Sequence, residues 1–478
     1  MNQQYILNPL LALTVILLIS ISFILIGIFY SKKYKGLNNY LVANRSVGTF
    51  SLTSSLVASA LGTWILFGPA SAATWGGIGA VIGYSLGTAF PLFAIIFIGK
   101  IFRNSYPNAK SLIEVVRLRF GKHIFKLILI LSIFYMTIFL IAEVTAVSIL
   151  MNYISGIELW ITALIVITSS LFYTLYGGLR ASIITDNIQF IVFIIFLLIS
   201  FSFLFSFNTN EFNFEFINKN KPYLISKDYL PNFTAGLTFF VAVAATNLFH
   251  QGNWQRVYAA KDNNVLKKSL LFAFLIVIPI VFLMGFTGLV SVSKNSNVIP
   301  DLAFFSILLE EEVLTLSIII IFLAISLTMS SIDTLINAIS SLVIVDGKKF
   351  FRHNHNYLKI SKQIIIALSV IAFFVASKGL SILYLFLLAD LFCCAFVLTV
   401  FYSFYNKNIK EKNAYISIII GLIGGFLMFP APDFSKSLLV GILLPKELFT
   451  PIVSQSLLFL SFVIATFLPL LVLKAKRF

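Results

Sequence analysis

Residues Ser51–Gly79 read SLTSSLVASALGTWILFGPASAATWGGIG, a stretch long enough to cross a bilayer yet dense in small and hydroxyl-bearing residues. Gly68-Pro69 interrupts it. Small residues let helix backbones approach closely, and an interrupted helix at membrane depth frees carbonyl groups that must line a cavity or bind an ion. We therefore predict that this stretch forms the wall of a site for a solute and an ion.

The composition of the whole chain is that of a membrane protein. Of 478 residues, 59% are hydrophobic and 11% are charged, and 51 are Phe, which exceeds the apolar content of soluble domains. We expect an all-α polytopic protein of the cell membrane, inner or plasma. The apolar runs predict about thirteen transmembrane helices, near residues 9–30, 48–68, 76–101, 123–152, 158–176, 185–207, 234–251, 266–293, 313–345, 361–377, 379–404, 414–429 and 453–474.

The formal charge of +16 follows from membrane topology. Most of the 34 Lys and Arg residues fall in loops on one side of the predicted spans. The positive-inside rule then predicts an N-terminus outside and a C-terminus in the cytoplasm. Because topology explains the basic charge, we expect the lipid bilayer as a partner and no nucleic acid.

The predicted spans fall into two groups of five. The interrupted span 48–68 opens one group and the short polar span 234–251 opens the other, a pattern typical of repeats with a binding site at the bilayer midplane. Because five is odd, the two groups must have inverted orientations. The predicted organisation is 1–46, a peripheral helix and basic cytoplasmic loop; 47–207, the first repeat (helices 2–6); 208–232, an extracellular loop; 233–405, the second repeat (helices 7–11); and 406–478, peripheral helices 12–13 with a cytoplasmic tail.

The ninth predicted span carries a stripe of polar side chains. Ser330, Thr334, Asn337 and Ser341 recur at spacings that place them on one helix face. Such a stripe ordinarily holds helices together. Asp333 lies within it, however, and an ionisable residue inside a span costs about 2.5–3.5 kcal/mol. The stripe therefore favours an oxygen-lined site for a monovalent cation.

Other acidic residues leave alternatives open. Asp186 follows a Gly-Gly turn and suits either a helix N-cap or a cation ligand. Glu143 and Asp390 lie deep in apolar sequence, where each could pair with a polar neighbour or carry a proton. The sequence shows no nucleophile–base–acid set, metal-ligand spacing or phosphate-binding loop, so we do not expect an enzyme.

Three motifs resemble the sodium:solute symporter family, which includes sodium-coupled proline, glucose, iodide and pantothenate carriers and relatives that move urea. The motifs are Y-T-x-x-G-G-L-R-A-x-x-x-T-D-x-x-Q at 173–189, Q-R-x-x-A-A-K at 255–261 and M-S-S-x-D-x-x-x-N at 329–337. The resemblance implies a five-plus-five inverted repeat of the LeuT type that works by alternating access.

The resemblance also implies site residues. For sodium these are the carbonyls of Ala58, Leu61 and Leu327 and the hydroxyls of Ser330 and Ser331. Asp186 matches an aspartate linked to a second cation position or to coupling. The implied solute site comprises Gly62, Thr63, Trp64, Ile65, Thr246 and Asn247.

Two positions depart from known members of the family. Ala60 stands where proline carriers have an acidic residue, and Ile65 stands where glucose carriers have a polar one. We expect a sodium-coupled secondary active symporter that imports a small polar organic solute, with sodium as the coupling ion and no cofactor. The alternatives are a proton-coupled carrier of a urea-like or amine solute and a nutrient sensor with a transporter fold. The oligomeric state stays open, a homo-oligomer included.

Overall fold

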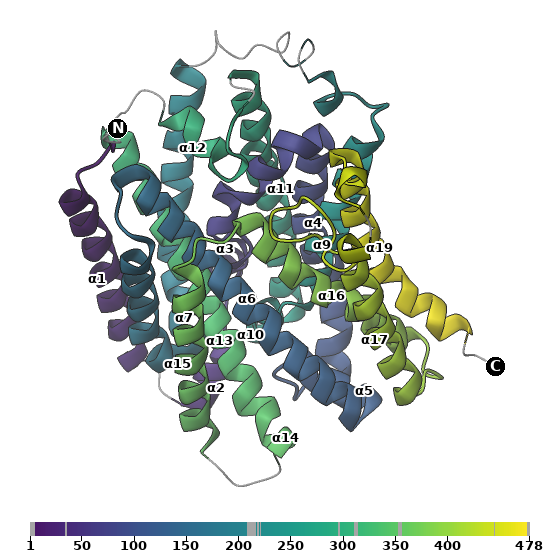
Figure 1. The fold of residues 1–478 in the computed structure, drawn as a ribbon. Helices are drawn as coiled ribbons and strands as arrows, with labels where there is room; N and C mark the ends of the chain where they lie inside the picture. The colour runs from purple at the N-terminus through teal and green to yellow at the C-terminus, as the bar shows by residue number, and fades with distance from the viewer. Residues whose placement is uncertain are drawn as a thin grey trace.

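The computed structural model describes residues 5–33, 36–207, 217, 219, 221–294, 297–309, 314–351, 356–443 and 445–475. These residues are almost entirely helical (Figure 1). The α-helices are α1 (Pro9–Lys33), α2 (Leu37–Val42), α3 (Thr49–Ala60), α4 (Gly68–Ser105), α5 (Leu112–Phe120), α6 (Lys122–Ser155), α7 (Leu159–Phe207), α9 (Leu230–Phe249), α10 (Gln251–Ala259), α11 (Asn263–Lys294), α12 (Ala303–Leu308), α13 (Leu314–Leu342), α14 (Lys348–Phe351), α15 (Tyr357–Ala376), α16 (Ile382–Tyr405), α17 (Glu411–Met428), α18 (Val440–Leu443) and α19 (Pro451–Ala475). The short elements are η1 (Ala43–Arg45), η2 (Thr63–Leu66), η3 (Pro222–Leu224), η4 (Pro300–Leu302), the π-helical η5 (Val343–Gly347) and η6 (Lys446–Leu448).

The helices confirm a multi-pass membrane protein. Within the described residues, 11 helices are long and apolar enough to cross a membrane. The other two predicted spans, 48–68 and 158–176, fall on the 12-residue helix α3 and on the short apolar segment Leu159–Phe172. Large apolar side chains such as Leu10, Phe29 and Phe97 are exposed on the outer surface, where lipid tails would cover them.

The span that opens the first half is broken, but not where its sequence indicated. Helix α3 ends at Ala60, and Leu61 and Gly62 leave helical geometry before the turn η2. Gly68-Pro69, the predicted interruption, instead begins α4. Proline suits the first turn of a helix because its missing N–H would have no intrahelical partner there. The break therefore covers residues 61–67.

A second change of direction lies inside α4. Gly77 has φ 60° and ψ −155°, a left-handed φ that favours glycine. The second piece of the broken span is therefore 68–76, and the long membrane helix that follows begins after Gly77. The predicted boundary between the first two spans of this group, near residues 68–76, was accordingly wrong.

The span that opens the second half is broken as well. Helix α9 ends at Phe249, His250 has ψ 118°, and α10 begins at Gln251. The His250 Nδ1 atom accepts a hydrogen bond from the Gly252 backbone N–H at 3.1 Å, which caps α10. The predicted short polar span 234–251 thus continues to residue 259 in two pieces.

The predicted spans 158–176 and 185–207 form one element, α7, which bends at Gly178 (φ 58°, ψ −167°). Asp186 lies inside the helical segment that follows the bend and is fully buried. The N-cap interpretation of Asp186 was therefore wrong, because the helix begins well before it.

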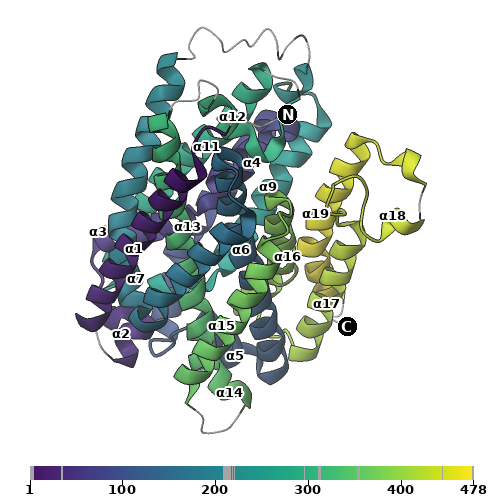
Figure 2. The same ribbon diagram turned by 60° about the vertical axis from the view of Figure 1, so that its left-hand side comes forward.

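Helix α1 and the pair α17 and α19 lie at opposite edges of the helix bundle (Figures 1 and 2). Helix α4 packs along α9 and α11, whereas α1 lies beside α7 at one edge and α17 and α19 lie beside α16 at the other. Helices α4 and α9 approach closely because Gly83 faces Gly236 and the Gly79 N–H donates to Asn232 Oδ1 at 2.6 Å. A Cβ atom on Gly83 would lie 2.7 Å from the Gly236 carbonyl carbon.

We expect Gly83→Ala to lower the apparent melting temperature of the purified protein, because overpacking against backbone costs about 1–3 kcal/mol. Gly48→Ala is the matched control, since a Cβ atom there meets nothing within 4 Å. Equal melting temperatures for the two variants would contradict the close packing of α4 on α9.

Candidate functional site

The break in the first span lies directly against α13. The Thr63 hydroxyl hydrogen-bonds with the Thr328 hydroxyl, and a Cβ atom on Gly62 would lie 2.5 Å from Ser331 Oγ. Ser331 Oγ is buried and has no hydrogen-bond partner among the described residues. The two segments that the sequence singled out for an ion site are thus in contact.

Glu143 of α6 satisfies backbone donors at the break. Its Oε2 atom accepts a hydrogen bond from the Thr63 N–H at 2.9 Å, and the Trp64 N–H also faces the carboxyl group. These N–H groups begin the turn η2, where a helical turn has no internal acceptors. Gly62 is required beside them because a side chain there would collide with Glu143 Oε1. Glu143 therefore stabilises the broken backbone from a neighbouring helix.

The predicted sodium ligands fall on both sides of this contact. Ala58 lies in the last turn of α3 and Leu61 follows it, where helix carbonyls lack intrahelical partners. The Leu61 N–H donates to Val57 O at 2.9 Å, which closes that last turn. Ser330 Oγ donates to Asp186 Oδ1 at 2.7 Å. Leu327 is buried on α13 one turn before Ser331. The assignment of these five residues to sodium stays a prediction.

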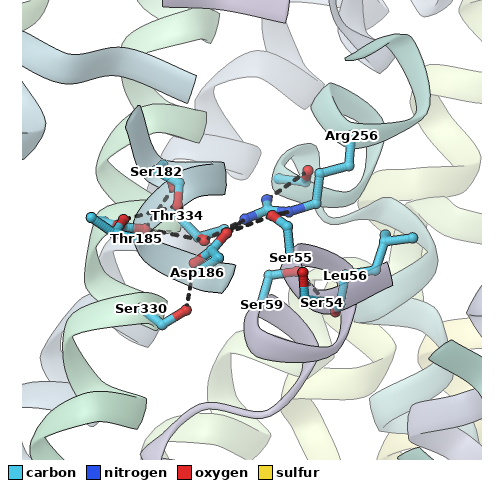
Figure 3. Close-up of polar contacts among 12 residues, drawn as sticks. Ser54, Ser55, Leu56, Ser59, Ser182, Thr185, Asp186, Arg256, Ser330 and Thr334 are labelled. Carbon is cyan, nitrogen blue, oxygen red and sulfur yellow. Dashed lines mark hydrogen bonds and ion pairs between the residues drawn. The ribbon is translucent and has the colours of Figure 1, made fainter. Parts of the chain in front are cut away.

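Asp186 belongs to a buried polar network with Arg256 at its centre (Figure 3). One Arg256 Nη atom lies 2.7 Å from Asp186 Oδ2, and both side chains are fully buried. Arg256 also donates to Ser55 Oγ at 2.7 Å, to Thr334 Oγ1 at 3.0 Å and to the Gly252 carbonyl at 3.1 Å. The network therefore connects α3, α7, α10 and α13, and it includes the predicted sodium ligand Ser330.

Arg256 was not predicted as a site residue. Its signal was the Q-R-x-x-A-A-K run, which showed that an arginine was present without indicating its partner.

A second buried carboxylate, that of Asp333, lies beside the network. Asp333 Oδ1 accepts a hydrogen bond from Ser182 Oγ at 2.9 Å, and Asp333 Oδ2 accepts one from Thr185 Oγ1 at 3.3 Å. Asp333 thus joins α13 to α7 through two hydroxyl groups.

A cavity lies beside the break, and its empty space of about 590 Å³ includes the part that opens to solvent. Its lining comes from α3, η2, α4, α6, α9, α13 and α16 and from His250 between α9 and α10. The lining residues are Ser59, Ala60, Trp64, Tyr84, Phe139, Glu143, Val243, Thr246, Asn247, His250, Ser331, Thr334, Leu335, Phe386 and Asp390.

The cavity includes half of the predicted solute residues. Trp64, Thr246 and Asn247 line it, whereas Gly62, Thr63 and Ile65 are buried at the break and do not. Glu143 and Asp390, both noted in the sequence as buried acids without an assigned role, also line the cavity. The aromatic residues Tyr84, Phe139 and Phe386 were missed, because their convergence from separate helices has no local sequence signal.

Aromatic rings form two walls of the cavity. The Trp64 and Tyr84 rings stack with centroids 5.6 Å apart, and Tyr84 stacks in turn on Phe239 at 4.6 Å. Phe139 and Phe386 pack with ring centroids 5.3 Å apart. These contacts hold the rings in fixed orientations, so the cavity is apolar at its sides and polar where Thr246, Asn247, Asp390 and Ser331 face it.

A sequence model of the sodium:solute symporter family matches residues 40–421, which is most of the chain. The chain belongs to the sodium:solute symporter family. The resemblance seen in the motifs is confirmed, and both family and fold are those of membrane transporters.

Individual relatives are more distant from this symporter. It is 26% identical over 380 residues to the spermidine transporter DUR31 of Candida albicans, and the aligned region covers 78% of this chain and 71% of the relative. It is 24% identical over 304 residues to the sodium/glucose cotransporter of Vibrio parahaemolyticus, and that aligned region covers 57% of this chain and 53% of the cotransporter.

Solved structures confirm the predicted fold class. A substrate-bound, outward-open Na⁺-coupled sialic acid symporter matches with a TM-score of 0.72 at 18% identity, over 96% of this chain and 97% of that one. The nucleobase-cation symporter Mhp1 in a closed conformation matches with a TM-score of 0.54 at 12% identity, over 92% and 95% of the two chains. At these identities the likeness shows the fold alone, a LeuT-type arrangement.

The buried ion pair predicts a specific pattern of stability. Removing one partner of a buried pair leaves the other uncompensated and costs about 3–5 kcal/mol. We expect Asp186→Asn and Arg256→Gln each to lower the apparent melting temperature strongly, and the double variant to lower it by clearly less than the sum. Strictly additive losses in this double-mutant cycle would show that the two side chains do not interact.

Proposed function

We propose that this symporter couples the import of a small polar organic solute to sodium by alternating access. The observation that carries the proposal is the contact between the break at 61–67 and α13, where Ser331 Oγ is buried and has no hydrogen-bond partner in the described part of the chain. Buried hydroxyl oxygens are nearly always satisfied, and a hard monovalent cation would supply what this one lacks. The names of relatives give spermidine, glucose and urea as solutes, all small and polar.

The ion acts by holding the broken backbone. The carbonyls of Ala58 and Leu61 on one side and of Leu327 on the other, with the hydroxyls of Ser330 and Ser331, surround sodium in the outward-facing state. The ion ties α3 to α13 and fixes the shape of the cavity beside η2. Solute then binds, the outer side closes, and separation of α3 from α13 releases both into the cell.

Asp186 contributes to coupling through Ser330. The Asp186 carboxylate accepts a hydrogen bond from the Ser330 hydroxyl at 2.7 Å, and the charge of Arg256 neutralises that of the carboxylate. The Ser330 oxygen lone pairs therefore stay available for a cation while its hydrogen is held away. This gives the predicted coupling residue a definite role beside the ion.

Transmembrane voltage adds to the driving force. Moving one sodium charge inward across about 100 mV releases about 2.3 kcal/mol. That free energy corresponds to a roughly 50-fold solute gradient, before the sodium concentration gradient is added. For import, the protein lies in the cell membrane with its N-terminus outside. The basic α14 segment with Lys348 and Lys349 then faces the cytoplasm.

We expect Ser331→Ala and Ser330→Ala to raise the sodium concentration for half-maximal solute uptake by about tenfold or more, because each removes an oxygen from the first coordination shell. Ser369→Ala on α15 is the control, since Ser369 Oγ is also buried without a described partner but lies outside the cavity. Uptake into proteoliposomes at varied sodium, with potassium as replacement, measures the effect. Wild-type sodium dependence in both site variants would refute the proposal.

Proton coupling is the second candidate function, because Glu143 and Asp390 are buried and line the cavity. A proton gradient imposed in sodium-free potassium medium distinguishes proton coupling from sodium coupling. The sodium proposal predicts no accumulation of solute under that gradient, whereas accumulation would favour proton coupling.

A further inference from the structure

We propose that the solute of this cavity is an organic cation bearing an ammonium group, and that Asp390 is the residue that recognises its charge. This inference rests on the proposed transport function and names the substrate class of the same site. It follows from the different surroundings of the two carboxylates that line the cavity, Glu143 and Asp390, and of Asp186 in the neighbouring network.

Two of these carboxylates already have partners within the fold. Asp186 is paired with Arg256, and Glu143 accepts the backbone N–H groups of the break. Asp390 of α16 differs: it is 4% exposed, it interacts with the Thr246 hydroxyl, and it forms no ion pair with any residue that the structure describes. A buried carboxylate without a countercharge costs several kcal/mol. A cation entering the cavity would offset that cost.

Two other polar side chains of the cavity, Asn247 and Thr246, can accept hydrogen bonds from a ligand. One Asn247 amide N–H donates to the Val243 carbonyl at 3.1 Å, and the amide oxygen can accept. The Thr246 hydroxyl, which lies 3.2 Å from the Ala242 carbonyl and also beside Asp390, has one proton to donate, so its oxygen lone pairs can accept as well. Ammonium groups donate and never accept. These two acceptors therefore suit an ammonium group.

The walls suit the rest of such a molecule. Trp64, Tyr84, Phe139 and Phe386 line the cavity, with the Tyr84 ring stacked between Trp64 and Phe239. Aromatic side chains pack against methylene groups, and an uncovered ring face also attracts a cation. An alkyl amine or a short diamine combines both features.

A second cavity supports the same charge preference. It has an empty volume of about 1170 Å³ and is lined by residues of α4, η4, α16 and the 432–455 region, including Asp301, Asp433, Trp75, Phe434 and Phe449. Hydrogen bonds from the Ser435 hydroxyl and backbone N–H lower the pKa of Asp433, so it is ionised at neutral pH. Carboxylates that line a cavity attract cations to it.

The test uses the purified wild-type symporter in sodium buffer and a panel of probes matched in size. Radiolabelled 1,4-diaminobutane is the probe. Unlabelled butylamine, 1,4-butanediol, glucose, urea and glutamate are each tested as competitors. We expect saturable binding of the diamine, competition by butylamine, and none by 1,4-butanediol, which has the same carbon chain without charge. Tighter binding of any neutral or anionic compound than of both amines would overturn the proposal.

Asp390→Asn keeps the shape of the side chain and removes its charge. Loss of a buried charge partner costs 2–5 kcal/mol, so we expect at least about 30-fold weaker diamine binding. Asp228→Asn, an exposed site, removes the same charge and should bind as wild type. Wild-type affinity in Asp390→Asn would overturn the assignment of Asp390. A folding defect in that variant is recognised by gel filtration, and the wild-type panel then decides alone.

The binding assay also separates this inference from the proposed function. Amine binding that is unaffected by replacing sodium with potassium would support the substrate class and contradict sodium coupling. Sodium-dependent uptake of a neutral solute would support the coupling and contradict the substrate class.

Discussion

A helix that stops inside a membrane leaves backbone N–H and C=O groups that no lipid can satisfy, and this constraint organises the centre of the symporter. At the break between α3 and α4, the donor side is satisfied by Glu143, which reaches from α6 to the N–H groups of Thr63 and Trp64. Gly62, just after α3, lies against the buried Ser331 of α13. An arrangement that satisfies donors with protein and leaves oxygens without partners would suit a cation, and the ion site that we propose depends on it.

The Asp186–Arg256 pair connects that site to the second broken span. Arg256 lies on α10 and contacts α3, α7 and α13 through one guanidinium group, whose planar set of donors suits several acceptors at once. A rearrangement that separates α3 from α13 must also change the hydrogen bonds of Arg256. The two broken spans are therefore linked through Arg256, and the alternating access that we propose would have to rearrange this link.

The sequence predicted the properties that depend on local composition. Apolar runs placed the membrane helices, and the hydroxyl stripe on the ninth span located the buried polar face of α13 around Ser330 and Asp333. The break was predicted in the right span but at Gly68-Pro69, because proline signals a helix end as readily as the helix start that it forms here. Arg256 and Asp186 are 70 residues apart, and no local pattern pairs them. The aromatic lining and the position of Asp390 in the cavity depend on five or more helices converging, so only the tertiary structure shows them.

The central claim is that sodium holds the break of the first span against α13. Hydrogen–deuterium exchange of the solute-free symporter, compared in sodium and in potassium at equal ionic strength, tests it without any substitution. The account predicts slower exchange in sodium for the amides of residues 61–67 and of the facing α13 segment around Ser331, with little change in peripheral α17 and α19. Equal exchange of the 61–67 amides in the two salts would contradict it.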